Sequence, residues 1–331
     1  MPTFRVATFN LENFDETEAG ERPSLDERIA LMRPQIERLR ADVVCFQEIN
    51  GQERPDEPRD LHALRALLAE TDLEGASLTS TRTQTGQVYD QRNLVVASNF
   101  PVVSSTQIRN DLVPPPEYRR LTADPPDDGA REIGVERPIQ HVVLDIGEDV
   151  MQTRLLHVIN VHLKSKRPTN IPGQKVDNFT WRTASGWAEG FFLSSLKRMS
   201  QALEVRWLVD QILDDDPDAQ IIVAGDFNAE PNEVPVLAIR GDVESTGNGD
   251  LARRVLVPIE QTIPEPSRFT LLFQGRGEMI DHMLVTRNLL AGYRGSEIHN
   301  EILHDESLAF AGDAKFPESD HAPVVAEFER P

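Results

Sequence analysis

The sequence predicts a mixed α/β fold in which two β-sheets form the core and helices cover them. Strand-like and helix-like segments alternate along the 331 residues. Several strand-like segments follow one another directly, as in hairpins, whereas a single parallel sheet needs a crossover between its strands. The first and last strand-like segments both carry polar ends. We therefore expect the chain to close on itself as one domain that spans residues 1–331.

The spacing of apolar residues predicts the individual strands and helices. Strand patterns cover residues 4–10, 42–47, 91–98, 102–108, 139–146, 154–163, 220–225, 280–286 and 322–328. Helical spacing covers residues 25–40, 61–68 and 199–213. Asn-Phe-Pro at 99–101 is a turn signal, so the strands on either side of it are expected to pair. The proline-rich residues 110–137 predict a surface loop.

Composition excludes several classes of protein. Hydrophobic residues make up 39% and charged residues 27%, which is typical of a globular protein and excludes a mainly disordered, collagenous or membrane-spanning chain. The formal charge of −21 disfavours nonspecific coating of duplex nucleic acid. Cys45 is the single cysteine, so no internal disulfide forms, and its apolar surroundings predict an inert core residue. The first ten residues lack the pattern of a signal peptide, so we expect a cytoplasmic location. We also expect no association with a membrane and no obligate protein partner.

Six strand ends share one pattern, in which an apolar strand finishes in a carboxylate, amide or imidazole. They are TFNLE at 8–12, FQE at 46–48, NVHLK at 160–164, GDFN at 225–228, IDH at 280–282 and SDH at 319–321. Alternate residues of a strand share a face, so these polar tips are expected to meet at one edge. The set is rich in oxygen ligands and has no thiolate, which suits Mg²⁺ or Mn²⁺. Phosphoryl transfer needs such a metal ion, a carboxylate to activate water and donors for the phosphate.

These six motifs, in this order, resemble those of the endonuclease/exonuclease/phosphatase superfamily, which includes pancreatic-type deoxyribonuclease and the exonuclease III class of repair enzymes. They run from Thr8 to His321, which is nearly the whole chain. The resemblance implies a DNase I-like, four-layered α/β/β/α sandwich with one divalent-metal site for Mg²⁺ or Mn²⁺.

The resemblance also implies a role for each motif residue. The implied metal ligands are Glu48, Asn10, Asp320 and Glu12. The implied catalytic residues are Asp226 for the attacking water, Asn228 and His162 for the phosphate, and His321 with its orienting carboxylate Asp281. His282 is expected to face away from Asp281 and to be structural.

Two departures from the family pattern stand out. Some members pair the equivalent of His162 with a glutamate in the region that here spans residues 89–96, which contains no glutamate. The residues after GDFN read Ala-Glu-Pro, without the aromatic–arginine pair expected of inositol polyphosphate phosphatases.

The stretch from 164 to 206 reverses the local charge, with eight basic and three acidic residues. All three tryptophans lie in it or just beyond it, and Trp207 is expected in the core. Basic residues interleaved with aromatic ones suit a single strand whose bases stack while its phosphates are neutralised. We therefore expect an insertion at about 165–200 to bind substrate through Lys164, Lys175, Trp181 and Arg182. The alternative is an amphipathic helix packed on the sandwich.

The function expected from the sequence is metal-dependent hydrolysis of phosphodiester bonds by in-line attack of water, in a nuclease that acts on single-stranded or nicked nucleic acid. One alternative is a phosphatase or phosphodiesterase that acts on a small molecule or a lipid head group. Another is a catalytically silent phosphate-binding module on the same scaffold.

Overall fold

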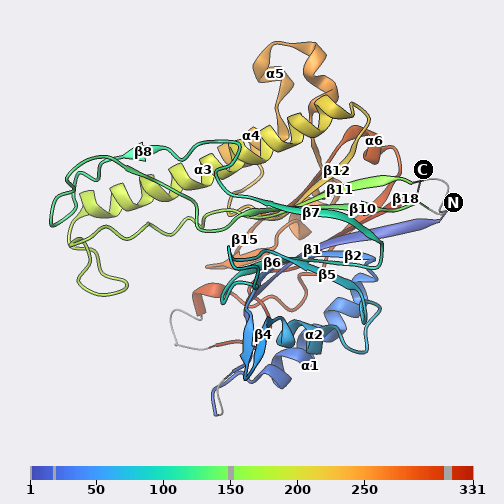
Figure 1. Ribbon diagram of the computed structural model, residues 1–331, viewed down its shortest axis with the longest axis horizontal. Helices are drawn as coiled ribbons and strands as arrows, with labels where there is room; N and C mark the ends of the chain where they lie inside the picture. The colour runs from blue at the N-terminus through green and yellow to red at the C-terminus, as the bar shows by residue number, and fades with distance from the viewer. Residues whose placement is uncertain (1, 18–19, 148–152, 309–314, 331) are drawn as a thin grey trace.

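The computed structural model describes residues 2–17, 20–147, 153–308 and 315–330. Two six-stranded sheets stack face to face, and helices cover the outer face of each (Figure 1). The architecture is the predicted α/β/β/α sandwich. Both sheets contain antiparallel and parallel strand pairs. Some neighbouring strands are therefore joined by hairpins, and others are joined by longer crossover connections.

The first sheet contains both ends of the chain. Its strand order is β17-β18-β1-β2-β6-β5, with bounds Tyr293–Ile298, Val324–Glu329, Thr3–Phe14, Val43–Ile49, Asn93–Ser98 and Ser77–Ser80. The first strand, β1, pairs antiparallel with the last strand, β18, and parallel with β2. The parallel register places Asn10 beside Gln47, so the motifs at the ends of β1 and β2 come out at the same edge.

The second sheet contains the remaining motif strands. Its order is β13-β16-β12-β11-β10-β7, with bounds Val257–Pro258, Asp281–Val285, Gln220–Asp226, Leu155–His162, Ile139–Asp145 and Val102–Ile108. His162 on β11 pairs with Asp226 on β12, and Asp226 pairs with Asp281 on β16. Three motif residues therefore stand side by side on adjacent strands.

Apolar side chains fill the three interfaces between the layers. A cluster that includes Phe4, Val158 and Phe328 lies between the sheets, and the rings of Phe4 and Phe328 stack with centroids 5.6 Å apart. A second cluster packs α1 (Leu25–Leu39) and α2 (His62–Leu68) onto the first sheet. A third packs α3 (Ala184–Asp215) and α4 (Val234–Arg240) onto the second sheet. Each sheet is thus apolar on both faces, as a four-layered sandwich requires.

The predicted pairing of residues 91–98 with 102–108 is wrong. Both segments are strands, but β6 lies in the first sheet between β2 and β5, while β7 is the edge of the second sheet and pairs with β10. The pattern of β6, buried at every position, is typical of a strand inside a sandwich, whereas most of β7 is exposed. The turn at 99–101 therefore carries the chain from one layer to the next.

Helix α3 is much longer than the predicted helix at 199–213. Its 32 residues correspond to about 48 Å, and its N-terminal half projects beyond the sheets (Figure 1). Residues 110–137 lie against this projection, where the buried carboxylates of Glu189 and Glu204 accept hydrogen bonds from backbone amides of Thr122 and Asn110. The prediction that Trp207 is a core residue is wrong, since 52% of its surface is exposed.

Smaller elements complete the described structure. They are β3 (Gln52–Arg54), β4 (Glu57–Asp60), β8 (Glu117–Tyr118), β9 (Arg131–Glu132), β14 (Leu271–Phe273), β15 (Arg276–Glu278), α5 (Val243–Thr246), α6 (Arg287–Leu290) and short 3₁₀ turns at Gly249–Arg254, Ile259–Thr262 and Glu265–Ser267. Among the described residues, no helix combines the length and the apolar character needed to cross a bilayer.

We predict that Gly225→Ala destabilises the fold by on the order of 3 kcal/mol or more. Gly225 has a φ of +142°, and a Cβ atom there would lie 2.0 Å from the carbonyl oxygen of Val161. Urea unfolding followed by circular dichroism measures the effect. Gly249→Ala is the matched control, since nothing lies within 4 Å of its added Cβ. Equal stability of the two variants would contradict the prediction.

Candidate active site

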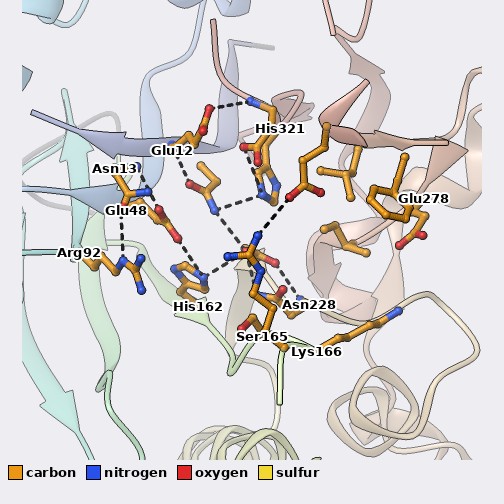
Figure 2. Close-up of a pocket in the computed structure, with 18 of the residues that line it drawn as sticks. Glu12, Asn13, Glu48, Arg92, His162, Ser165, Lys166, Asn228, Glu278 and His321 are labelled. Atoms are coloured by element: carbon orange, nitrogen blue, oxygen red, sulfur yellow. Dashed lines mark hydrogen bonds and ion pairs between the residues drawn. The ribbon is translucent and has the colours of Figure 1, made fainter. Parts of the chain in front are cut away.

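The polar strand ends meet in one pocket of about 500 Å³ at the edge of the sandwich (Figure 2). Eight of the nine residues assigned to the metal ion and to catalysis form its wall directly: Asn10, Glu12, Glu48, His162, Asp226, Asn228, Asp320 and His321. The ninth, Asp281, lies behind His321. The topology thus brings together residues that are more than 300 positions apart in sequence.

Glu48 stands at the end of β2 in a backbone conformation that side chains rarely adopt, with a φ of +59°. Its Oε2 accepts a hydrogen bond from the backbone amide of Asn13 at 3.0 Å. Burial by itself raises the pKa of Glu48, but His162, Arg137 and the other positive groups nearby outweigh it, so the pKa is lowered. Glu48 is therefore an ionised, oriented carboxylate inside the pocket.

Glu12 and Asp320 form a pair of close carboxylates. The backbone amide of Asp320 donates to Oε2 of Glu12 at 3.3 Å. Burial, and for Glu12 also repulsion from Asp320, raises the pKa of Glu12 to about 8 and that of Asp320 to about 6. Oδ1 of Asp320 is buried and has no hydrogen-bond partner among the described residues.

This carboxylate set fits a hard divalent cation. Glu12 and Asp320 are buried more deeply than their negative charges allow without compensation, and a cation held beside the ionised Glu48 would supply it. The amide oxygen of Asn10 accepts from the amide of Glu12 at 3.0 Å, which keeps Asn10 beside these carboxylates. An all-oxygen donor set of this kind is suited to Mg²⁺ or Mn²⁺.

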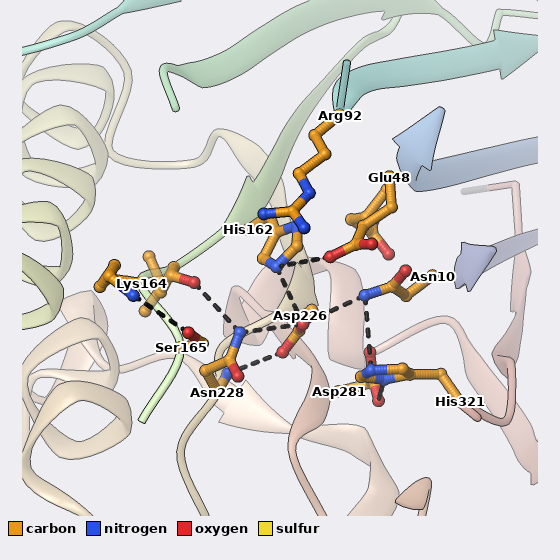
Figure 3. Close-up of polar contacts among 12 residues, drawn as sticks. Asn10, Glu48, Arg92, His162, Lys164, Ser165, Asp226, Asn228, Asp281 and His321 are labelled. Atoms are coloured by element: carbon orange, nitrogen blue, oxygen red, sulfur yellow. Dashed lines mark hydrogen bonds and ion pairs between the residues drawn. The ribbon is translucent and has the colours of Figure 1, made fainter. Parts of the chain in front are cut away.

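Asp226 is buried at the centre of the site and is surrounded by donors (Figure 3). Its Oδ2 lies 3.2 Å from Nδ2 of Asn10, 3.2 Å from Nε2 of His162 and 3.0 Å from Nδ2 of Asn228. Its Oδ1 accepts from the backbone amide of Asn228 at 2.8 Å. Burial alone would raise the pKa of Asp226. The neighbouring histidines and these hydrogen bonds outweigh burial, so the pKa is lowered and the carboxylate is ionised. An ionised, fixed carboxylate can only accept hydrogen bonds.

His321 and Asp281 form a buried pair. Nδ1 of His321 donates to Oδ2 of Asp281 at 2.8 Å, which leaves Nε2 directed toward the pocket. Burial lowers the pKa of His321, but Asp281, Asp320 and Asp226 together raise it well above its usual value. The ring is therefore positively charged at neutral pH and presents an N–H group to the pocket.

The buried Nδ1 of His162 has no glutamate partner among the described residues. Its Nε2 lies between Asp226 and Glu48, at 3.2 and 3.6 Å, while its buried Nδ1 has no partner among the described residues. This agrees with the absence of a glutamate from residues 89–96. Burial, together with Arg137, lowers the pKa of His162, while Asp226 and Glu48 act in the opposite direction.

A second group of possible metal ligands lies beside the first. One ligand atom from each of Asp226, Asp281 and His321 lies within 4.8 Å of the others. In this group, the pairing of His321 with Asp281 occupies Nδ1. Each group has a buried carboxylate oxygen without a hydrogen-bond partner among the described residues, Oδ1 of Asp281 here and Oδ1 of Asp320 in the first group, so the assignment of the cation to the carboxylates around Glu48 stays a prediction.

The six motifs did not indicate two further walls of the pocket, although Lys166 and Arg167 belong to the basic stretch noted in the sequence. One is basic and is formed by Arg92, Arg137, Lys166 and Arg167. The other is apolar and is formed by Leu271, Phe273 and Ile280. The arginines carry no motif, and only the folded structure brings Arg137 within 3.9 Å of Glu48.

The four residues predicted to bind substrate do not line the pocket. Lys164 is beside it: its Nζ donates to Oγ of Ser165, and burial lowers its pKa to about 8. Lys175 and Trp181 lie farther along the chain, with the lysine Nζ 4.8 Å from the indole centroid. The backbone amide of Arg182 donates to the carbonyl of Gln174. A role for these four residues in substrate binding stays a prediction.

His282 is structural, as predicted. It is fully buried, with Nδ1 2.7 Å from Glu260 and Nε2 2.8 Å from the carbonyl oxygen of Ala229. Since a carbonyl oxygen only accepts, Nε2 is a donor there. The contact ties β16 to the loop that follows Asp226. Cys45 is likewise buried, and burial raises the pKa of its thiol to about 12.

A family model described as the endonuclease/exonuclease/phosphatase family matches residues 7–321. The chain belongs to this family. Members of the family include nucleases and phosphatases, are hydrolases of phosphoester bonds and typically depend on a divalent metal ion. No curated protein matches the chain.

Solved structures of family proteins share the fold. An endonuclease/exonuclease/phosphatase from Bacteroides vulgatus is 17% identical, with 99% of both chains covered and a TM-score of 0.57. A truncated TDP2 from Caenorhabditis elegans is 15% identical, with 99% of this chain and 98% of that chain covered and a TM-score of 0.56. An AP endonuclease from Archaeoglobus fulgidus is 16% identical, with 99% and 100% covered and a TM-score of 0.52. At these identities the similarity establishes the fold.

We predict that the metal-free protein loses on the order of a few kcal/mol of unfolding free energy as the pH rises from about 5 to about 8. The raised pKa values of Asp320 and Glu12, about 6 and about 8, mean that these two carboxyl groups hold more protons in the folded state than in the unfolded chain in this range. The lowered pKa values of His141, His157 and His162 oppose this effect below about pH 6.5, and we expect the carboxyl groups to outweigh them. The raised pKa of His321 acts in the same direction. The stability that its protonated ring contributes is lost as the pH rises toward the pKa of His321 in the folded state.

Urea unfolding at several pH values, with chelator or with Mn²⁺, measures this loss. We expect Mn²⁺ to reverse it, because the cation binds the ionised carboxylates of the folded state. Glu12→Gln serves as the control variant and is expected to flatten the pH dependence of the metal-free protein. A metal-free protein that becomes more stable between about pH 5 and about pH 8 would disprove this account.

Proposed function

We propose that the protein is a Mg²⁺-dependent phosphodiesterase, and specifically a nuclease, that hydrolyses phosphodiester bonds by in-line attack of water. The observation that carries the proposal is the position of Asp226, whose carboxylate lies among the imidazoles of His162 and His321 and the amides of Asn10 and Asn228. An ionised carboxylate next to a protonated imidazole can orient a nucleophilic water and stabilise an anionic transition state in the same pocket.

Each residue has a role in the proposed reaction. Asp226 accepts a hydrogen bond from the water and receives its proton as the new phosphorus–oxygen bond forms and the bond to the leaving oxygen breaks. The N–H of the His321 imidazolium, oriented by Asp281, donates to the developing negative charge. Asn228 and His162 hold Asp226 in place. Their N–H groups would turn from Asp226 to the phosphate when the substrate binds. Proton transfer from His321 to the leaving oxygen is the alternative role for that ring.

Glu48, Asn10, Asp320 and Glu12 would hold the metal ion, and the bound ion would supply charge neutralisation at the phosphate oxygens. The basic wall favours a polyanionic substrate in a chain whose net charge is −21. We therefore favour nucleic acid over the rival small-molecule or lipid head-group phosphoester. A silent binding module is disfavoured because every motif residue is present. A cytoplasmic location, without an obligate protein partner, stays a prediction from the sequence.

We predict that Asp226→Asn lowers kcat for phosphodiester cleavage by roughly 10²–10⁴-fold, because the amide cannot accept the proton from water. Cleavage of labelled single-stranded DNA, duplex DNA, RNA and a chromogenic phosphodiester in Mg²⁺ measures the effect. Asp218→Asn, at an exposed position outside the pocket, is the control and is expected to keep full activity.

Chelator is expected to abolish cleavage of every substrate that the wild-type protein cleaves. Turnover of the chromogenic ester alone would favour the small-molecule rival. If the wild-type protein binds metal but cleaves none of the four substrates, the protein is a binding module and the proposal fails.

A further inference from the structure

We propose that residues 164–183 form a track that binds single-stranded nucleic acid on one side of the scissile phosphate, with Phe179 as a base-stacking residue. This inference rests on the proposed nuclease function and extends it to the class of substrate. The track belongs to the projection seen in Figure 1, called the arm here, which consists of residues 110–137, residues 164–183 and residues 184–200 of α3.

The track begins at the active site and leads away from it. Its first residues, Ser165, Lys166 and Arg167, line the pocket. The segment then runs antiparallel to α3, as shown by hydrogen bonds of Lys164 to Gln201, Thr169 to Gly190 and Gln174 to Thr183. From Gln201 to Thr183 the helix rises by about 27 Å. The track is thus long enough to contact several nucleotides beyond the cleaved bond.

The two segments that flank α3 in the arm differ in charge. Residues 164–183 contain five basic residues and one acidic residue, Asp177. Residues 110–137 contain seven acidic and four basic residues. The two segments meet midway along the arm, where the amide of Asp124 donates to the carbonyl of Pro172 and Nε2 of Gln174 donates to the carbonyl of Thr122. A phosphate backbone that leaves the pocket is therefore attracted to the basic residues of 164–183 and repelled by the acidic residues of 110–137.

The far end of the track carries exposed aromatic residues on a small hairpin. Lys175 and Trp181 form a bridge, and the amide of Val176 donates to the carbonyl of Thr180. Trp181 packs under Lys175 and against the buried Ile171 and Leu193, so its ring supports the hairpin. The ring of Phe179 is 80% exposed at the tip.

Nearby on α3, the stacked rings of Trp187 and Phe191 are also partly exposed, with centroids 5.7 Å apart. Exposed rings beside basic groups suit unpaired bases, since base–aromatic stacking and phosphate neutralisation act on the same strand. In a duplex the bases are stacked on one another and are not free to pack on Phe179. Charge complementarity, continuity with the pocket and exposed rings together favour a single strand over a protein or a lipid surface.

The test compares long and short substrates of the full-length protein. Phe179→Ala combined with Arg182→Gln is expected to raise KM for a single-stranded oligonucleotide of roughly 16 nucleotides by about 10-fold or more, while kcat stays unchanged. KM for an oligonucleotide of roughly 4 nucleotides, or for a chromogenic phosphodiester, is expected to stay at the wild-type value. Raising the salt concentration is expected to reduce the difference in KM between the wild type and the variant on the long oligonucleotide, because salt screens the attraction to the phosphates.

Leu121→Ala combined with Arg119→Gln is the matched control, because both residues are exposed on the 110–137 edge of the same arm. Equal KM values for the track variant, the control and the wild type on the long strand would overturn the proposal, even with full nuclease activity. A loss confined to duplex substrates would also overturn it. If the wild type cleaves neither long nor short substrates, the nuclease function itself fails, which is a distinct outcome.

Discussion

The site depends on the concentration of buried negative charge at one edge of the sandwich. Glu12, Glu48, Asp226, Asp281 and Asp320 are all buried or nearly so around one pocket. Buried carboxylates repel one another and favour protonation unless positive groups compensate them. The protein compensates Asp226 with histidines and asparagine amides, but burial leaves Glu12, Asp281 and Asp320 with raised pKa values. This imbalance is what a divalent cation would relieve.

The fold makes such crowding possible because it fixes each side chain through a strand end. Asn10 and Glu48 come from adjacent parallel strands of one sheet, and His162, Asp226 and Asp281 come from three adjacent strands of the other. The apolar interface between the two sheets holds their edges next to each other. Backbone strain is present at the same edge, where Glu48 and Asn228 both have positive φ values. The stability of the layers thus supports residues that would be unfavourable elsewhere.

The sequence predicted the layers and the motif residues well, because alternation of apolar residues and polar strand ends are local signals. It failed where the answer depends on contacts between distant segments. The turn at 99–101 indicates where β6 and β7 separate but not that they enter different sheets. Arg92 and Arg137 carry no motif, and only the packing places them on the wall of the pocket. The charges of residues 164–206 and of residues 110–137 can both be read from the sequence, but not that the two segments pack together along α3. Trp207 looked like a core residue because composition does not reveal which face of a helix is covered.

Anomalous diffraction from crystals grown with Mn²⁺ tests the central claim most directly, because it locates the cation without an activity assay. The account predicts one strong peak in the pocket, coordinated by oxygen atoms of Glu48 and Asp320 and adjacent to Asn10 and Glu12. A peak held instead by Asp226, Asp281 and His321 would contradict the assignment of roles, since those groups would then be ligands and not the catalytic pair and water acceptor. A pocket without any peak at saturating Mn²⁺ would contradict the metal-dependent account itself.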